Sequence, residues 1–448
     1  MTAKTRSASI SLALVALLFA FVSEAQGEAR IDAAFGDGGV ATQTVPNSGE
    51  AVALAEASNG AIIVAGVRNG ESPICGSFYS AGFEASGSKK LDYGLGGFAF
   101  GAANCNMAST IVGWRGTSTV LGMSSLVTGC SYAQRIGPNG SPTSWPGGAV
   151  SGRTKLCFGP TQGRAGIRMY SSAVDGKSRV LIGGDSNFGS SRTAGFVFRL
   201  KIDGTPDRSF SGKGLTRSGI PGMIKLFPKG SSSNQVSTVR TTGKGKVLVS
   251  GRLRGQPMVA QLNRRGALDR SFARGGLFLR DLDGNPRCLC SGISAAVRDS
   301  HGRTIVVGSS WSRGSGGTYR DRRLLVMRLT KRGQLDRTFG QGGIVRQGGS
   351  GWEWYGPTNL VLQNNGRIVV SASFKQSNAS TGWFHLVRFL PNGEIDKSFF
   401  DNGMFSAESV ALEGFARDMK RDHAGRILVA GGITGGESGS PSVLRIIP

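Results

Sequence analysis

The side chains in this sequence that could do chemistry are few: six cysteines, three histidines and an aspartate that recurs. His301 and His423 occupy the same position on two predicted hairpin turns, each close behind an aspartate, and such pairs could bind a metal. Asp and His are also ordinary turn residues, and no Cys/His cluster has the spacing of a ligand set. His385 falls in a predicted strand, where we expect it to pack. We therefore expect neither a metal site nor a cofactor.

The recurring aspartate offers a second possibility, a ring of carboxylates. A residue that every copy of a repeat needs usually serves the repeat itself, here by accepting backbone N–H bonds in a turn. We interpret these aspartates as a structural motif and assign no catalytic residue. The six copies are Asp32, Asp92, Asp207, Asp269, Asp336 and Asp396.

Each aspartate lies in a repeated phrase, of which residues 335–343 (Leu-Asp-Arg-Thr-Phe-Gly-Gln-Gly-Gly) are a clear copy. Most copies lie about 60 residues apart, and a fixed period of this kind indicates a repeat architecture. Between two copies come four short β-rich runs, with an Asn-Gly or Asp-Gly hairpin signal between the second and third. In the unit that starts at Leu335 the runs are Ile344-Val345, Asn359–Leu362, Arg367–Val370 and His385–Leu390.

Seven such units in one domain, residues 26–448, predict an all-β, seven-bladed β-propeller of four-stranded antiparallel blades. A parallel β-helix is the main rival, but its coils are shorter than this period and do not use antiparallel hairpins. The C-terminal run Ser442–Ile447 looks like the strand that elsewhere precedes the phrase, whereas the chain after the leader begins inside the phrase at Arg30-Ile31. We therefore expect the ring to be closed by pairing of the N- and C-terminal strands.

The phrase, the Asn/Asp-Gly hairpin and the run Leu325-Val326-Met327-Arg328-Leu329 resemble the delta-60 repeat family of bacterial secreted proteins. The resemblance covers nearly all of the chain after the leader and implies a propeller-like fold. It brings no catalytic signature that could be carried over. The second and third units depart from the pattern: Leu91-Asp92 is followed by a shortened phrase, and the next copy is eroded to residues 142–148.

Residues 1–25 have the pattern of a secretory signal peptide. Lys4 and Arg6 form a basic start, and Ile10–Val22 is an apolar stretch too short to span a bilayer comfortably. Small residues allow cleavage after Ala25 or after Ala29. No other stretch is apolar enough for a membrane span. We expect a secreted monomer, extracellular or on the cell surface.

The chain is strongly basic, with 53 Lys and Arg against 28 Asp and Glu and a net charge of +25. Cleavage after Ala25 would remove Lys4, Arg6 and Glu24 and leave +24. Such a charge attracts anionic polymers at low salt, although a regularly spread charge is also typical of a solvated surface. No Lys/Arg run is interleaved with aromatics, so we expect no dedicated nucleic-acid site.

The cysteine positions suggest disulfides in an oxidising compartment. Cys75 and Cys130 follow the third run of their units, and Cys105 and Cys157 precede the second run of the next units. We predict Cys75–Cys105 and Cys130–Cys157 bonds, each linking adjacent blades on one face. Cys288 and Cys290 either form a short-loop disulfide or stay free.

Aromatic residues that do not repeat gather in predicted loops of the fifth and sixth units. Aromatics on the loops of a rigid scaffold are typical of glycan or protein recognition, although they could instead cap the ends of the ring. We expect these loops to share the face that carries the cysteines. The candidate ligand-binding residues are Trp311, Tyr319, Trp352, Trp354, Tyr355 and Trp383.

Together these features predict a non-catalytic binding or surface-interaction scaffold. Its partner would be an anionic polysaccharide, another glycan-like ligand or another surface protein. The alternative is an extracellular hydrolase or lyase acting on polysaccharide. That enzyme would need non-repeated carboxylates to converge in a pocket, for example Glu353 with Asp281 or Asp283.

Overall fold

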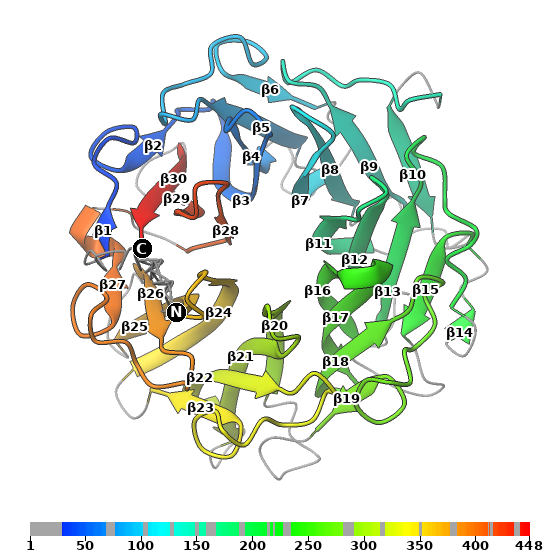
Figure 1. The fold of residues 1–448 in the computed structure, drawn as a ribbon. Coiled ribbons are helices and arrows are strands. Elements are labelled where there is room, and N and C mark those ends of the chain that lie inside the picture. The colour runs from blue at the N-terminus through cyan, green and yellow to red at the C-terminus, as the bar shows by residue number, and fades with distance from the viewer. Residues whose placement is uncertain are drawn as a thin grey trace, which may run out of the picture.

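The chain forms seven four-stranded antiparallel blades around a central channel, so the predicted seven-bladed β-propeller is confirmed (Figure 1). Among the described residues no helix is long and apolar enough to cross a membrane. The computed structural model describes residues 29–448 apart from 69–76, 102–105, 126–129, 148–151, 158–166, 188–192, 213–215, 218–219, 227–233, 281–290, 314–318, 349–351, 377–382, 411, 413–414 and 434–439.

In each blade the strands run from the channel outward in chain order. The first blade comprises β3 (Ser48–Glu56), β4 (Ile62–Arg68), β5 (Ser77–Phe83) and β6 (Phe98–Phe100). The second comprises β7 (Asn106–Trp114), β8 (Ser118–Ser125), β9 (Cys130–Ile136) and β10 (Arg153–Cys157). The third comprises β11 (Ile167–Val174), β12 (Val180–Asn187), β13 (Thr193–Leu200) and β15 (Met223–Leu226), with β14 (Thr216–Arg217) at its outer edge.

The next three blades repeat the plan. The fourth comprises β16 (Gln235–Thr242), β17 (Lys246–Leu253), β18 (Gln256–Leu262) and β19 (Leu277–Leu279). The fifth comprises β20 (Ser291–Arg298), β21 (Thr304–Arg313), β22 (Tyr319–Leu329) and β23 (Ile344–Gln347). The sixth comprises β24 (Trp352–Leu362), β25 (Ile368–Gln376), β26 (Trp383–Phe389) and β27 (Met404–Ser406).

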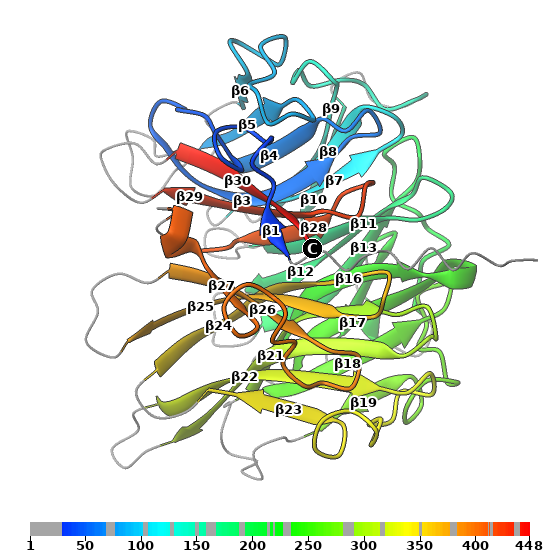
Figure 2. The same cartoon turned by 60° about the vertical axis from the view of Figure 1, so that its left-hand side comes forward.

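The seventh blade closes the ring from both ends of the chain. Its inner strands are β28 (Asp418–Arg421), β29 (Ile427–Ile433) and β30 (Ser440–Ile447), and its outer edge is β1 (Arg30–Ile31) with β2 (Val40–Thr42). Leu444 pairs with Val40, and Ile446 pairs with Ile31. Figure 2 shows β1 beside β30. The predicted closure by the terminal strands is confirmed, and it covers both sides of β30, which would otherwise be an open sheet edge.

The four strands of one sequence unit do not form one blade, which corrects the predicted grouping. Ile344–Gln347, the first run of the unit that starts at Leu335, pairs with β22 of the preceding blade, whereas the remaining runs form the sixth blade. The phrase therefore connects the third and fourth strands of a single blade. Sequence periodicity alone does not show where a cyclic repeat should be cut.

Glycine fixes the path of the phrase. Gly343 has a φ of 101°, and its N–H donates to the carbonyl of Phe339 over 2.8 Å. A Cβ at this position would lie 3.0 Å from Cβ of Leu335. Positive φ together with this close approach explains why the phrase ends in glycine.

The hydrophobic core is divided among the seven interfaces between neighbouring blades. Each interface has one cluster of buried side chains, and each cluster contains one aromatic residue from a phrase. In the two degenerate units Tyr93 and Trp145 take the place of phenylalanine. The other five are Phe35, Phe210, Phe272, Phe339 and Phe399, all fully buried. The phrase therefore supplies the anchor between one blade and the next.

Candidate functional site

Most phrase aspartates form an ion pair with an arginine on the third strand of their own blade, and most of these arginines also reach the next blade. Asp336 accepts Nε of Arg328 on β22 over 2.7 Å, and Nη2 of the same arginine donates to the Thr338 hydroxyl over 2.7 Å. The guanidinium stacks 4.9 Å from the Phe339 ring centre, and Nη1 donates to the Pro391 carbonyl in the next blade. We call this arrangement the arginine staple. Arg199, Arg388 and Arg445 pair in the same way with Asp207, Asp396 and Asp32.

The second carboxylate oxygen of these aspartates serves the turn. Oδ1 of Asp336 accepts the Thr338 backbone N–H over 3.2 Å and the Thr338 hydroxyl over 2.7 Å. Burial alone would raise the pKa of Asp336, but the hydrogen bonds from Thr338 and Arg328 outweigh it and hold the pKa below its usual range. Three of the roughly four acceptor sites of the Asp336 carboxylate are therefore occupied by the protein itself, so it is poorly suited to hold a substrate.

Two copies depart from the staple. In the fourth blade Gln261 stands where the others have arginine, and Asp269 pairs instead with Lys246 over 2.6 Å. Burial raises the pKa of Asp269, yet hydrogen bonds from Lys246, Ser271 and Gln261 bring it well below its ordinary value. Asp92 is exposed and pairs with Lys90 over 2.6 Å.

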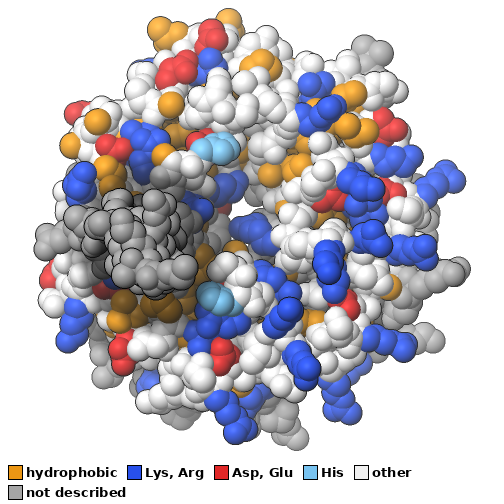
Figure 3. Space-filling model, in the orientation of Figure 1, with side chains coloured by type: hydrophobic (Ala, Val, Ile, Leu, Met, Phe, Trp, Pro, Cys, Tyr) orange, Lys and Arg blue, Asp and Glu red, His pale blue; other side chains and the backbone are white. Residues whose placement is uncertain are grey.

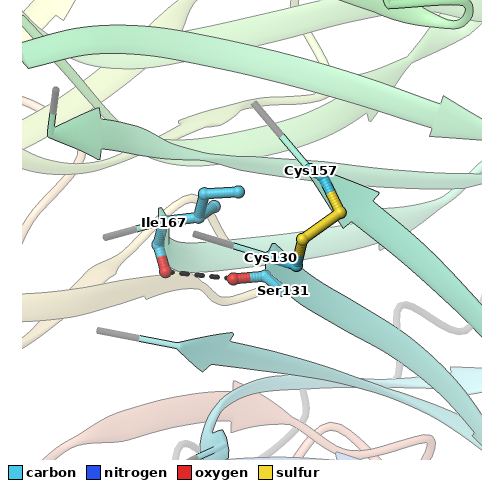
Figure 4. Close-up of a disulfide and its surroundings, with 4 residues drawn as sticks. All are labelled: Cys130, Ser131, Cys157 and Ile167. Atoms are coloured by element: carbon cyan, nitrogen blue, oxygen red, sulfur yellow. Dashed lines mark hydrogen bonds between the residues drawn. A yellow bond between two sulfur atoms is a disulfide. The ribbon is translucent and has the colours of Figure 1, made fainter. Parts of the chain in front are cut away.

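The Cys130–Cys157 disulfide is present, with the two Cα atoms 4.2 Å apart (Figure 4). Contrary to the prediction, it joins β9 to β10 inside one blade, because the strand that holds Cys157 belongs to the second blade and not to the third. The link to the third blade is made by the neighbouring Ser131, whose hydroxyl donates to the Ile167 carbonyl over 3.1 Å. The remaining cysteines, Cys75, Cys105, Cys288 and Cys290, lie outside the described residues.

The candidate aromatics lie in strands and not in the predicted loops. Trp311 lies near the C-terminal end of β21, Tyr319 is the first residue of β22, and Trp383 is the first residue of β26. Trp352, Trp354 and Tyr355 lie in the first four residues of β24. The backbone register places Trp354 opposite Phe374 and Phe374 opposite Trp383. The Trp383 side chain is half-buried. These strand ends and those that hold Cys130 and Cys157 lie at the same end of the up-and-down blades, which we call the loop face.

The histidines occupy three different surroundings. Nδ1 of His423 lies 2.8 Å from Oε2 of Glu56, so the last blade is tied to the first. His301 is exposed on the turn after β20, and His385 is buried. Burial lowers the pKa of His385 to about 4, and its Nδ1 lies 3.1 Å from the Trp383 carbonyl oxygen. In the described part of the chain no group of three or more metal-ligating side chains occurs.

A cavity with many charged side chains opens at the other end of the channel, where the hairpin turns between the first and second strands of the blades lie. We call this cavity of about 790 Å³ the funnel. Figure 3 shows Lys and Arg side chains gathered beside the central hollow. Five cations and one carboxylate line the funnel: Arg240, Arg298, Arg303, Lys420, Arg421 and Asp299.

Three of the funnel cations have no ion pair among the residues that the structure describes. Arg421 donates to the Leu362 carbonyl and to Oδ1 of Asn364, and Arg298 makes only a long 3.5 Å hydrogen bond to Thr304. The Nε of Arg298 is buried without a partner in the described chain. By contrast, Arg303 is neutralised by Asp299 over 2.7 Å. The funnel is therefore strongly positive, and burial lowers the pKa of the Arg298 guanidinium without discharging it.

A narrow polar passage continues from the funnel along the channel. This cavity of about 70 Å³, which we call the throat, shares Arg240, Lys420 and Ser172 with the funnel. Arg240 and Lys420 occupy the same position on the innermost strands of the fourth and seventh blades, opposite Leu248 and Leu428. Figure 1 shows β16 and β28 on opposite sides of the channel. The other five blades place small or branched apolar residues there: Ala55, Val112, Ala173, Val297 and Val361.

One buried acid group touches the throat wall. The Tyr170 hydroxyl, on a strand that lines the throat, donates to Oδ2 of Asp185 over 3.1 Å, and Arg168 donates to Oδ1 over 2.9 Å. Burial raises the pKa of Asp185 above its ordinary value despite the opposing charge of Arg168. Glu353, Asp281 and Asp283, the carboxylates proposed for an enzyme, cannot be placed, because their side chains lie outside the described residues.

The sequence analysis did not predict the funnel cations, although their positions in the repeat could have indicated them. Arg240, Arg298, Lys420 and Arg421 lie near the ends of innermost strands, at positions that are apolar or small in most other units. A comparison of charges between equivalent positions of the units, and not only of aromatics, would have singled them out. Their convergence on one cavity follows only from the closed ring.

Comparison with known proteins supports a β-propeller repeat family. Residues 175–210 and 363–399, which span the hairpin-to-phrase parts of the third and sixth blades, match a family model described as a β-propeller domain of unknown function (DUF5122). The finer delta-60 name stays a proposal. No curated protein matches the chain.

Solved structures that match are distant. A protein from Lactobacillus plantarum is 12% identical, with 77% of this chain and 83% of that chain covered and a TM-score of 0.42. Sqt1 from Chaetomium thermophilum is 11% identical, with 90% and 99% covered and a TM-score of 0.41. A gluconolactonase from Xanthomonas campestris is 11% identical, with 93% and 95% covered and a TM-score of 0.36. None of these likenesses bears on the ligand or activity of this chain.

Proposed function

We propose that this protein is a secreted, non-catalytic binding propeller of the extracellular space or cell surface, and that its ligand is anionic and glycan-like. The observation that carries the proposal is the funnel, in which five cationic side chains face one carboxylate. Its volume of about 790 Å³ lies within the range of ligand sites, roughly 300–1,000 Å³. The leader pattern and the delta-60 resemblance support export.

Electrostatics supplies the affinity in this proposal. The chain carries a net charge of +25, and clefts lined by one sign of charge concentrate oppositely charged ligands. Arg240, Arg298 and Arg421 make hydrogen bonds but form no ion pair with a carboxylate among the described residues, so we expect their charge to be available for a ligand. Guanidinium groups also match the geometry of carboxylate, sulfate and phosphate groups.

The test is binding of the purified mature chain to heparin, polygalacturonate and neutral dextran at increasing salt. We expect both acidic polymers to bind at low salt, to weaken steeply as salt rises, and dextran not to bind. R298Q with R421Q should weaken acidic-polymer binding about tenfold or more. The matched control, R208Q with R270Q, removes the same charge from exposed phrase arginines outside the funnel lining and should bind like the parent. Equal binding at low and high salt, or equal loss in both double variants, would contradict the proposal.

The loop-face aromatics lie at the opposite end of the channel from the funnel, and we propose that they form a second contact surface that contributes selectivity for a long ligand. W352A with W354A should reduce discrimination between acidic glycans while the thermal unfolding midpoint stays close to that of the parent. Unchanged discrimination would remove these residues from the proposed site.

The runner-up is a hydrolase or lyase acting on polysaccharide, and Asp185 is the observation that favours it. A buried carboxyl group with a raised pKa beside a tyrosine hydroxyl is the kind of pair used for proton transfer. Release of oligosaccharides from polygalacturonate by the parent, lost in D185N, would establish this alternative in place of the binding protein.

A further inference from the structure

We propose that the throat is a binding site for a single terminal oxyanion, a carboxylate, sulfate or phosphate group, so that the ligand enters the channel end-on with Arg240 as its principal contact. This inference rests on the proposed function and specifies how the ligand is held. The protein would then bind the anionic end of a chain, or a small acid, in preference to an internal segment of a polymer.

Arg240 has unused donors that face the cavity. Among the described residues only its Nη1 makes hydrogen bonds, to the Ser171 hydroxyl over 3.4 Å and to the Val239 carbonyl over 3.2 Å, and no carboxylate lies within ion-pair distance. The side chain lines both the funnel and the throat. A guanidinium that keeps Nε and Nη2 free can hold an oxyanion through two parallel hydrogen bonds.

Lys420 supplies a second positive charge from across the channel. Its ammonium group lies 3.3 Å from Oδ2 of Asp418 and donates to the carbonyls of Ile111 and Leu54, so its three protons are already committed. Lys420 therefore acts through its charge and not through direct hydrogen bonds. Lys420 and Arg240 line the same two cavities, so an anion between them would relieve the repulsion of their charges.

The one carboxylate in the throat is fully compensated. Asp418 accepts the Leu54 N–H over 3.0 Å, the Asn359 side-chain amide over 2.7 Å and the Met419 N–H over 2.9 Å, besides lying next to Lys420. Its carboxylate oxygens are occupied by these bonds, although its charge also acts on Arg240 at longer range. The remaining wall is polar, with a Thr110–Ser172 hydroxyl pair at 2.7 Å. An anion in the throat would therefore meet hydroxyl groups and three cationic side chains, Arg240, Arg417 and Lys420.

Size sets the direction of entry. The throat offers about 70 Å³, whereas the funnel offers about 790 Å³. A single charged group fits in the smaller space and a sugar ring does not, so the body of the ligand stays in the funnel. The geometry therefore favours end-on binding.

Calorimetric titration of the mature chain with small acids tests the throat directly. The probes are glucuronate, glucose 6-sulfate, glucose 6-phosphate and inorganic phosphate, with glucose and methyl glucuronate ester as neutral controls. We expect at least one acid to bind and to compete with heparin, and neither neutral control to bind; the preferred acid identifies the oxyanion. R240Q should weaken acid binding at least tenfold, R240K should restore part of it, and R208Q on the outer phrase should have no effect.

The outcomes separate the throat from the funnel. Loss of small-acid binding in R240Q, together with weaker heparin binding, supports the throat as the place that holds the charged end of the ligand. Two outcomes overturn the proposed throat site but leave the proposed function standing. In the first, heparin binds and small acids do not compete with it. In the second, R240Q has the circular dichroism spectrum of the parent and binds the acid equally well. Failure of heparin and small acids alike overturns both.

Discussion

Arg328 illustrates how a single side chain holds two blades together. It is buried with Asp336 at a distance of 2.7 Å, stacks on Phe339 and reaches the Pro391 carbonyl of the next blade. Removing one partner of a buried ion pair leaves an uncompensated charge, which costs about 3–5 kcal/mol. The aspartates of the phrase are thus structural because an arginine from the preceding strand occupies them.

We predict that R328M lowers the free energy of unfolding by about 3–5 kcal/mol, measured by urea denaturation. The neighbouring Arg337 belongs to the same phrase but is exposed, so R337M should change the free energy by less than about 0.5 kcal/mol. Equal effects of the two substitutions would show that the staple does not stabilise the ring.

Lys420 gives the proposed anion site a pH dependence. Burial lowers the pKa of Lys420 below its ordinary value of 10.5; Asp418 opposes the shift, and Arg240 adds to it. The lysine is charged below its folded-state pKa and neutral above it, so oxyanion affinity should fall as pH rises through that lowered pKa. Arg240, Arg417, Asp418 and Tyr170 also line the throat. Burial raises the pKa of Tyr170 far above its usual range, so Tyr170 stays neutral in this interval.

The measurement is calorimetric titration of the preferred small acid between about pH 7 and pH 10. We expect affinity to decrease toward the alkaline end in the parent, with proton uptake on binding. K420R keeps its charge over the whole interval and should show a flat profile. A decline of the same steepness in K420R would assign the titration to another group.

Among the strands, β30 is the one that closes the ring. It is the third strand of the last blade, and it pairs with β29 on one side and with β1 and β2 of the N-terminus on the other. Val443, Leu444 and Ile446 are fully buried in two different inter-blade clusters. No other strand described here joins the two ends of the chain.

Deleting residues 443–448 should therefore open the ring. Three buried aliphatic side chains contribute about 1.5–3 kcal/mol each, and their sum is comparable to the roughly 5–15 kcal/mol that separates folded from unfolded proteins. We expect loss of a cooperative thermal transition, or a fall of more than about 10 °C in Tm, by scanning calorimetry. Removal of Pro448 alone is the control and should leave Tm unchanged. An unaltered Tm in the longer deletion would mean that closure does not stabilise the propeller.

At the scale of the whole molecule the two ends of the ring differ in chemistry. The loop face carries the Cys130–Cys157 disulfide and the strand ends with the non-repeated aromatics, whereas the opposite end opens into the basic funnel. Both ends are built on blades that the phrase locks to one another. A ligand that occupied the funnel and throat would contact innermost strands of several blades, so its contacts would lie on regular strands of the scaffold.

The sequence by itself determined the number of blades, the hairpins within them and the closure by the terminal strands. These features follow from short-range patterns that recur, such as the phrase with Asp336 and Phe339 or the Asn365-Gly366 turn, and each copy repeats the same local physics. Tertiary structure decided which strand pairs with which across unit boundaries. That pairing moved Ile344–Gln347 into the preceding blade and turned the predicted inter-blade disulfide into one within a blade.

Tertiary structure also decided the candidate site. Arg240 and Lys420 are far apart in the chain and unremarkable in their own units, and they meet only because a closed ring brings equivalent positions of all innermost strands to one axis. The charge on the funnel depends in turn on which arginines already have a carboxylate partner, as Arg303 does and Arg298 does not. The closure of the ring and the pairing of charged side chains both depend on residues far apart in the sequence. The spacing of residues along the chain therefore could not locate this cavity.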